Sequence, residues 1–225
     1  MRGLFSKSVR IVGGTAGGRR IQSPKGSGTR PTSDRVREAV FSMLSSLGGL
    51  RDATVLDLFA GSGALGLEAL SQGARRAVFV ESSAAGVAAI RANLAVLGRT
   101  QGGAEVVRGD AVDFAARCGR FDIVFADPPY AFTRWAEVLP SLAGKVGLAV
   151  LETSERTRGR PGVSSAGSAD FESARSPAGL DDLVAQLAAS AQPMWETVKA
   201  KRYGGTVVFV LRSLVTVGPA QEGNF

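Results

Sequence analysis

The sequence predicts an α/β fold built on a mainly parallel sheet with helices on both faces. After Gly48-Gly49, short apolar strands alternate with helical stretches, which is typical of such sheets. The first of these strands runs directly into a glycine-rich turn at residues 60–66. Near the C-terminus, two strand candidates flank residues 202–205, a predicted hairpin that makes the last strand antiparallel.

Residues 1–31 are expected to form a basic arm ahead of the sheet. Residues 10–14 and 18–21 are short extended candidates around a glycine-rich turn, as in a small β-ribbon, and 23–31 are a loop. A helix is predicted over 32–44. Thr32 or Ser33 can cap its N-terminus, Asp34 suits the positive end of the helix dipole, and apolar residues recur at helical spacing.

Residues 32–225 are expected to form one domain with a flexible insert at 153–179. The insert is rich in Ser, Gly and Arg and has no strand or helix period, so it is either a linker or an extra phosphate contact. The strand candidates are 54–59, 77–80, 105–107, 122–126, 146–151, 195–201 and 206–211, and the later helix candidates are 64–71, 84–97, 111–117, 133–142 and 180–189.

The positive charge is concentrated at one end of the chain. Residues 1–37 hold nine Lys or Arg and one acid, a net charge of +8, and the whole chain carries +7, which leaves −1 for the rest. A basic arm on a near-neutral body indicates a nucleic-acid contact, whereas a solvated tail is the plainer interpretation. The predicted RNA-binding residues are Arg10, Arg19, Arg20, Arg30, Arg35 and Arg37, and in the predicted helix Arg35 and Arg37 lie off the apolar stripe.

The composition excludes several kinds of chemistry. The chain has no His and one cysteine, Cys118, so Ser/His/Asp triads, Cys/His dyads, intrachain disulfides and Cys-based metal sites are absent. We expect no metal, a packing role for Cys118 and a cytoplasmic location. No apolar run approaches the length of a membrane span. The acid-poor start also suits a transit peptide, but its strand-like pattern favours a structured arm.

Asp127-Pro128-Pro129-Tyr130 is the most informative motif. It ends the apolar run 121–126, and each proline lacks an N–H and fixes its φ. The Asp127 carboxylate and the Pro128 carbonyl can then accept both hydrogens of an exocyclic amine, while Tyr130 stacks on the ring. Nucleobases are commonly held in this way. We therefore predict that Asp127, Pro128 and Tyr130 are catalytic; the plainer alternative is a simple strand end.

Acidic residues near the ends of successive strands predict a cofactor site. Gly61, Gly63 and Gly66 fit a dinucleotide fingerprint, and Glu81 follows Gly61 by 20 residues, so an NAD-dependent oxidoreductase is one interpretation. A negatively lined site repels a pyrophosphate and suits a sulfonium, which favours S-adenosylmethionine. In this interpretation Glu81 binds the ribose and Asp110 the adenine amine. The predicted cofactor-binding residues are Asp57, Ala60, Gly61, Gly63, Glu81, Asp110 and Ala111.

Several motifs together resemble the bacterial enzymes that methylate the 2-amino group of one guanine in the head region of 16S rRNA. They are residues 10–14, Gly28-Thr29-Arg30-Pro31-Thr32 with 34–38, 56–68 and 127–130, in that family's order. The arginine-proline-threonine sequence is the discriminating part. The insert at 153–179 is longer than that family's pattern.

The resemblance implies a class I, Rossmann-like methyltransferase fold with a seven-stranded sheet whose last strand is antiparallel. It also implies S-adenosylmethionine as methyl donor, guanine N2 as acceptor, and 16S rRNA in an assembling small subunit as partner, gripped by the N-terminal ribbon. We expect a monomer.

Other functions remain open on the sequence. The nearest is an N6-adenine methyltransferase on DNA or another RNA, which can use the same four-residue chemistry but normally needs a larger recognition domain. A protein glutamine methyltransferase usually has Asn where this chain has Asp127. A ribosome-assembly factor with dispensable methyl transfer is the alternative outside enzyme chemistry.

Overall fold

The structure is a computed structural model that describes residues 5–24, 34–98, 103–129, 131–154 and 194–215. Its main element is a seven-stranded sheet with the order β5-β4-β3-β6-β7-β9-β8. The strands are β3 (Thr54–Leu58), β4 (Arg76–Glu81), β5 (Ala104–Arg108), β6 (Phe121–Ala126), β7 (Val146–Ser154), β8 (Trp195–Tyr203) and β9 (Thr206–Ser213). Strands β3 to β7 are parallel, and β9 runs antiparallel to both β7 and β8. The predicted fold class is confirmed.

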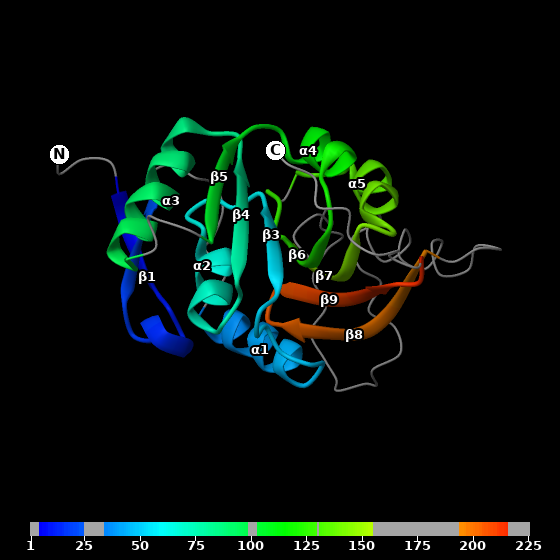
Figure 1. Cartoon of the computed structure of the whole chain (residues 1–225), viewed down its shortest axis with the longest axis horizontal. Coiled ribbons are helices and arrows are strands. Elements are labelled where there is room, and N and C mark those ends of the chain that lie inside the picture. The colour runs from blue at the N-terminus through cyan, green and yellow to red at the C-terminus, as the bar shows by residue number, and fades with distance from the viewer. Residues whose placement is uncertain (1–4, 25–33, 99–102, 130, 155–193, 216–225) are drawn as a thin grey trace, which may run out of the picture.

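Helices cover both faces of the sheet (Figure 1). Residues of α1 (Asp34–Ser45), α2 (Ala64–Ser71) and α3 (Ala84–Val96) pack in one apolar cluster with Val55, Phe79 and Phe125. Residues of α4 (Ala111–Arg117) and α5 (Trp135–Leu142) pack in a second cluster with Leu56, Val78 and Val124. Because side chains alternate along a strand, each strand contributes to both clusters. The predicted bounds of α2 and α4 match the structure.

The N-terminal ribbon is displaced from its predicted position. Its strands are β1 (Phe5–Arg10) and β2 (Arg20–Pro24), with a 3-10 helix, η1 (Gly14–Ala16), between them. Ile11 still donates to the carbonyl of Arg19 and accepts from Gly18 N, but the amides of Val12 and Gly13 bind elsewhere and donate to the two oxygens of Glu68 at 2.7 and 2.8 Å. Figure 1 shows the ribbon beside α2 and α3, away from β8 and β9.

Buried polar side chains hold the ribbon against the domain. Glu68, Ser71 and Asn93 are almost fully buried. Glu68 binds the amides of Val12 and Gly13. Ser71 binds Gly13 and Ala16, and Asn93 binds Gln22. Arg37 is fully buried as well and donates from Nη2 to the carbonyl of Arg10. The arm is therefore a docked part of the structure in the described range.

The prediction that Arg37 lies off the apolar stripe of its helix, free to bind RNA, is wrong. Its side chain is 0% exposed and pairs with Asp34 at 2.8 Å. A guanidinium buried between the helix and the ribbon backbone supports the docking of the ribbon and offers no surface to a phosphate. Arg35, two residues earlier on α1, is exposed.

Two further predictions differ at their edges. Strand β7 continues to Ser154, into the predicted insert, because Thr153 and Ser154 pair with Val207 and Thr206 of β9. The predicted loop 23–31 is wrong at its start, because Ser23 and Pro24 belong to β2 and pair with β1. The rest of that loop with Arg30, the helix at 180–189 and Tyr130 lie outside the described residues, as does the insert from residue 155 onward. Cys118 is buried in the second apolar cluster, as expected for a packing residue.

Candidate functional site

The glycine loop between β3 and α2 is tightly bent. Gly61 and Gly63 have φ of 55° and 79°, in the left-handed region that glycine adopts without a Cβ clash. Phe59 has φ of 63°, a strained conformation for a large side chain and one that occurs preferentially at functional sites. A Cβ at Gly61 meets nothing closer than the Phe59 carbonyl at 3.9 Å, so there is open space beside the loop.

Glu81 lies at the end of β4 directly beside this loop. Its Oε2 accepts from Gly61 N at 2.8 Å and its Oε1 from Ser83 N at 2.7 Å. Gly86 leaves room for it, since a Cβ there would lie 2.5 Å from the Glu81 Cγ. The structure thus brings together Glu81 and Gly61, two of the predicted cofactor-binding residues, and fixes the carboxylate by backbone amides. Its ribose-binding role stays a prediction.

Asp57 is buried beneath the loop. Its Oδ2 accepts from Gly66 N at 2.9 Å, near the start of α2. Burial raises the pKa of this carboxyl from 3.8 to about 7; the hydrogen bond from Gly66 opposes this rise, and the charges of Asp127 and Glu81 add to it. Leu58 at the end of β3 pairs with Ala126 at the end of β6, so the two strand ends bring Asp57 and Asp127 close together.

The pKa of Asp57 predicts a pH dependence of stability. The folded protein holds this proton up to about pH 7, whereas an unfolded Asp loses it near 3.8. The folded state therefore binds more protons between these values, and the free energy of unfolding falls as pH rises from about 4 to about 7. The shift corresponds to a change on the order of a few kcal/mol.

Asp57→Asn, which keeps an acceptor for Gly66 N, is expected to flatten this slope. Urea denaturation of both proteins between pH 4 and 8 measures it. The variant gains most relative to the wild type at pH 8 and least at pH 4. Parallel curves for the two proteins would contradict the assignment of the slope to Asp57.

Asp110 and Ala111 mark the start of α4 at the end of β5. Asp110 is the N-cap of this helix: its Oδ1 accepts from Val112 N at 2.9 Å and from Asp113 N at 3.1 Å. The Nη1 of Arg134, which precedes α5, lies 3.9 Å from the same oxygen. Asp110 therefore caps α4 in the structure. Its role in adenine binding stays a prediction.

Asp127 and Pro128 follow the end of β6 and are both partly exposed. Ile123 and Phe125 of β6 belong to the cluster under α1, α2 and α3, so by alternation Asp127 lies on that face, as Asp57 and Glu81 do. The carbonyl of Pro129 accepts from Phe132 N at 2.9 Å, which closes a turn. The carboxylate and the glycine loop therefore meet at one edge of the sheet.

The sequence interpretation missed an aromatic contact across this edge. The rings of Phe59, in the glycine loop, and Phe132, after the proline turn, are 4.9 Å apart at 67°, and Phe132 packs at 5.1 Å and 90° against Trp135. Edge-to-face geometry of this kind is favourable. It joins the glycine loop to the segment after Asp127. The one local sign of this contact is the unusual φ of Phe59, and a backbone angle cannot be read from a sequence pattern.

Glu152 is a second residue that the sequence interpretation missed. It lies within β7 directly after Leu151, which pairs with Ala126 at the end of β6, so Glu152 and Asp127 follow paired residues of neighbouring strands. It is 3% exposed. The signal was present in the sequence, because Glu152 follows an apolar run as Asp127 does.

Four of the six predicted RNA-binding arginines are exposed in the described residues. Arg10 and Arg20 are exposed and face each other as partners in the β1–β2 ladder. Arg19 is exposed too, although its Nη1 donates to the Val96 carbonyl at the end of α3 at 2.7 Å. Arg35 is exposed on α1, separate from the ribbon ladder.

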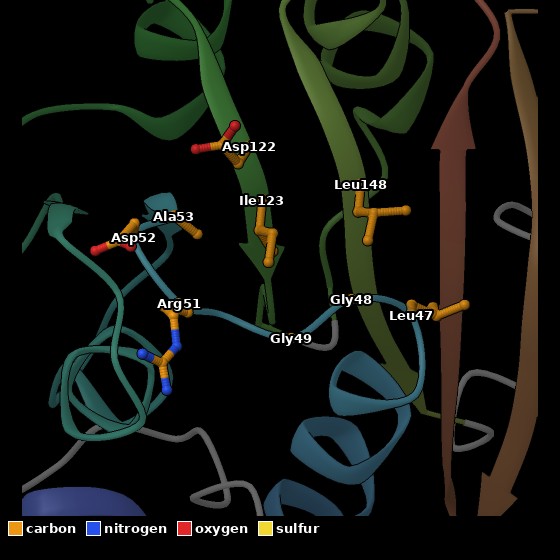
Figure 2. Close-up of a pocket in the computed structure, with 9 residues that line it drawn as sticks. All are labelled: Leu47, Gly48, Gly49, Arg51, Asp52, Ala53, Asp122, Ile123 and Leu148. Carbon is orange, nitrogen blue, oxygen red and sulfur yellow. The ribbon is translucent and has the colours of Figure 1, made fainter.

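A pocket of about 340 Å³ lies at the opposite edge of the sheet (Figure 2). It is lined by residues before β3 and at the starts of β6 and β7, including Arg51, Asp52 and Asp122. The Oδ2 of Asp122 accepts from both N and Oγ1 of Thr54. Ligands of parallel sheets bind at the carboxyl ends of the strands, so this pocket is separate from the candidate site.

The described ranges contain neither a cluster of metal-ligating side chains nor a membrane-spanning helix. No cluster of three or more His, Cys, Asp or Glu side chains there is arranged to hold a metal ion. None of the helices in those ranges is long and apolar enough to cross a membrane.

Several known proteins with similar sequences or structures are named as methyltransferases. Ribosomal RNA small subunit methyltransferase D of Escherichia coli K12 is 46% identical over 126 residues, which cover 56% of this chain and 62% of that protein. The putative rRNA methyltransferase YlbH of Bacillus subtilis is 39% identical over 54% of this chain and 67% of its own length. The solved structure of the putative methyltransferase yhhF from E. coli matches with a TM-score of 0.66 and 30% identity, over 92% of this chain and 98% of that one.

The strand order, the glycine loop and the edge that carries Asp127 define a protein with the Rossmann-like methyltransferase fold. The family model described as conserved hypothetical protein 95 matches residues 9–164. The chain belongs to this family.

Proposed function

We propose that this protein transfers a methyl group from S-adenosylmethionine to the exocyclic N2 of a guanine in 16S rRNA. The observation that carries the proposal is the meeting of the glycine loop, Glu81 and Asp127 at one sheet edge. The relatives named as rRNA methyltransferases support the reaction class and the RNA. Guanine N2 rests on the resemblance of the sequence motifs.

The residues present suit this methyl donor. Glu81 carries two acceptor oxygens next to the ribose position that the fold implies, and the space beside Gly61 is open. Asp57, Glu81 and Asp127 are close enough for the last two to raise the pKa of the first. The carboxylates of Glu81 and Asp127 favour a sulfonium and an amino group over a pyrophosphate.

Asp127 and Pro128 would prepare the acceptor. When bound, S-adenosylmethionine supplies a methyl group whose C–S bond breaks as an N–C bond forms, and the amine releases one proton. The lone pair of the guanine amine is delocalised into the ring, so the amine is a weak nucleophile. Acceptance of its two hydrogens by the Asp127 carboxylate and the Pro128 carbonyl would localise the lone pair and aim it. Positioning and electrostatics then supply most of the acceleration.

Mass spectrometry of nucleosides tests the proposal. The protein is incubated with isotopically labelled S-adenosylmethionine and either deproteinised 16S rRNA or small ribosomal subunits. Labelled 2-methylguanosine is the expected product, and comparison of the two substrates shows whether the protein needs an assembled particle. Labelled N6-methyladenine would identify the alternative enzyme, and no labelled nucleoside would contradict RNA methylation.

The ribbon is proposed to bind the RNA backbone through Arg10 and Arg20. Changing both to Gln is expected to weaken binding and to reduce the slope of log K against log salt by about 0.7–0.9 per lost phosphate contact. Filter binding over a salt series measures this slope. Arg117→Gln, at the exposed end of α4 on the other face of the sheet, is the matched control. An unchanged slope in the ribbon variant would count against this interface.

A further inference from the structure

Asn93 joins the ribbon to the glycine loop. This side chain is on α3 and is 0% exposed. Its Oδ1 accepts from Gln22 N at 2.8 Å, and its Nδ2 donates to the carbonyls of Gln22 and Ser62, both at 2.9 Å. Gln22 belongs to β2 and Ser62 to the glycine loop. One N–H and two carbonyls require this orientation of the amide, so a single buried group connects the two segments.

The same stretch of loop is fixed on its other side by Glu81. Gly61 donates its N–H to Glu81 Oε2 at 2.8 Å, and the next residue, Ser62, gives its carbonyl to Asn93. Consecutive residues of the loop are thus held by the predicted ribose-binding carboxylate and by the residue that binds the ribbon. The position of this loop depends on both contacts.

The segment before β2 contacts α3 at a second point. Arg19 donates to the Val96 carbonyl at the last residue of α3, one turn beyond Asn93. A shift of the ribbon relative to α3 would break these contacts and leave the buried amide of Asn93 and its partners unpaired, which is costly in the protein interior. The ribbon, α3 and the glycine loop are therefore expected to dock together or to loosen together.

We propose that Asn93 is a positioning residue that couples RNA binding by the ribbon to methyl-donor binding by the glycine loop. The identity of the two ligands rests on the proposed function. RNA bound to the ribbon favours the docked arrangement, in which Asn93 holds the loop ready for the donor. By linkage, bound donor strengthens RNA binding by the same factor.

Calorimetric titration of the full chain with S-adenosylhomocysteine, the product form that prevents turnover, tests the coupling. The dissociation constant is measured with and without saturating deproteinised 16S rRNA. In the wild type it is expected to fall about fivefold or more with RNA, the lower end of common coupling factors. In Asn93→Ala the ratio is expected to approach one. Ala88→Ser, at an exposed position of the same helix, keeps the wild-type ratio.

The outcomes separate this inference from the proposed function. Binding of both ligands by the wild type without any change in the dissociation constant overturns the coupling and leaves the function intact. Undiminished coupling in a folded Asn93→Ala overturns the role of Asn93, with thermal melting as the check on folding. If Asn93→Ala does not fold, the ratio of the wild-type dissociation constants with and without RNA still tests the coupling. Failure of the wild type to bind either ligand overturns both proposals.

Discussion

Replacing Asp127 by alanine is expected to lower kcat by about 10²–10³-fold or more, the usual effect of removing one group that stabilises a transition state. Without the carboxylate, the amine loses one of its two proposed acceptors and its lone pair stays in the ring. Binding of S-adenosylmethionine should survive, because the glycine loop and Glu81 hold each other independently of Asp127. Single-turnover methylation and donor titration measure the two effects separately.

The same strand offers a matched control. Asp122 lies at the other end of β6, at the edge shown in Figure 2, where it accepts hydrogen bonds from Thr54. Asp122→Asn keeps an acceptor there and is expected to retain near wild-type kcat. Turnover by Asp127→Ala at the rate of this control would falsify the role given to Asp127.

Among the variants proposed for this protein, Glu68→Ala is expected to cause the largest fall in the free energy of unfolding. Glu68 is 0% exposed, and its two oxygens accept from the backbone of Val12 and Gly13 and from Gln72 Nε2. Removing them leaves buried donors unpaired and frees the ribbon. Hydrogen bonds to charged groups contribute about 1.5–3 kcal/mol each, so a loss on the order of 3–5 kcal/mol in the free energy of unfolding is expected. Urea denaturation measures it.

The control for this variant is Glu38→Ala on α1, whose side chain is exposed. Exposed substitutions usually change stability by less than about 0.5 kcal/mol. Equal midpoints for the two variants would mean that Glu68 does not hold the ribbon. If Glu68→Ala keeps the wild-type urea midpoint but is cleaved faster by protease at residues 5–24, the ribbon opens separately from the sheet.

The sequence predicted those elements whose local pattern agrees with their environment. Helix α2 has a glycine turn before it and a dense apolar run, and α4 has Asp110 as its cap, so both were bounded correctly. The ribbon was misplaced because residues 11–13 look extended in the sequence. In the structure Glu68, 55 or more residues away, takes the amides of Val12 and Gly13 out of the ladder. No local signal carries that information.

The site shows the same division. Carboxylates that follow apolar runs were visible in the sequence, and Glu152 was overlooked although it too follows such a run, in this case inside β7. Arg37 was misassigned because a guanidinium off the apolar stripe is normally solvated. Here the ribbon covers it and its Nη2 binds the carbonyl of Arg10.

The sequence by itself determined the class of fold, the glycine turn, the acids at the strand ends and the basic character of the arm, since period, spacing and composition are local properties. The tertiary structure decided which of these groups share an environment. It placed Asp57 within reach of the charges of Asp127 and Glu81, which helps to raise its pKa to about 7. It also placed one buried amide, that of Asn93, between the ribbon and the glycine loop. Burial and long-range hydrogen bonding depend on how distant segments pack, and packing is not encoded in any single stretch of the chain.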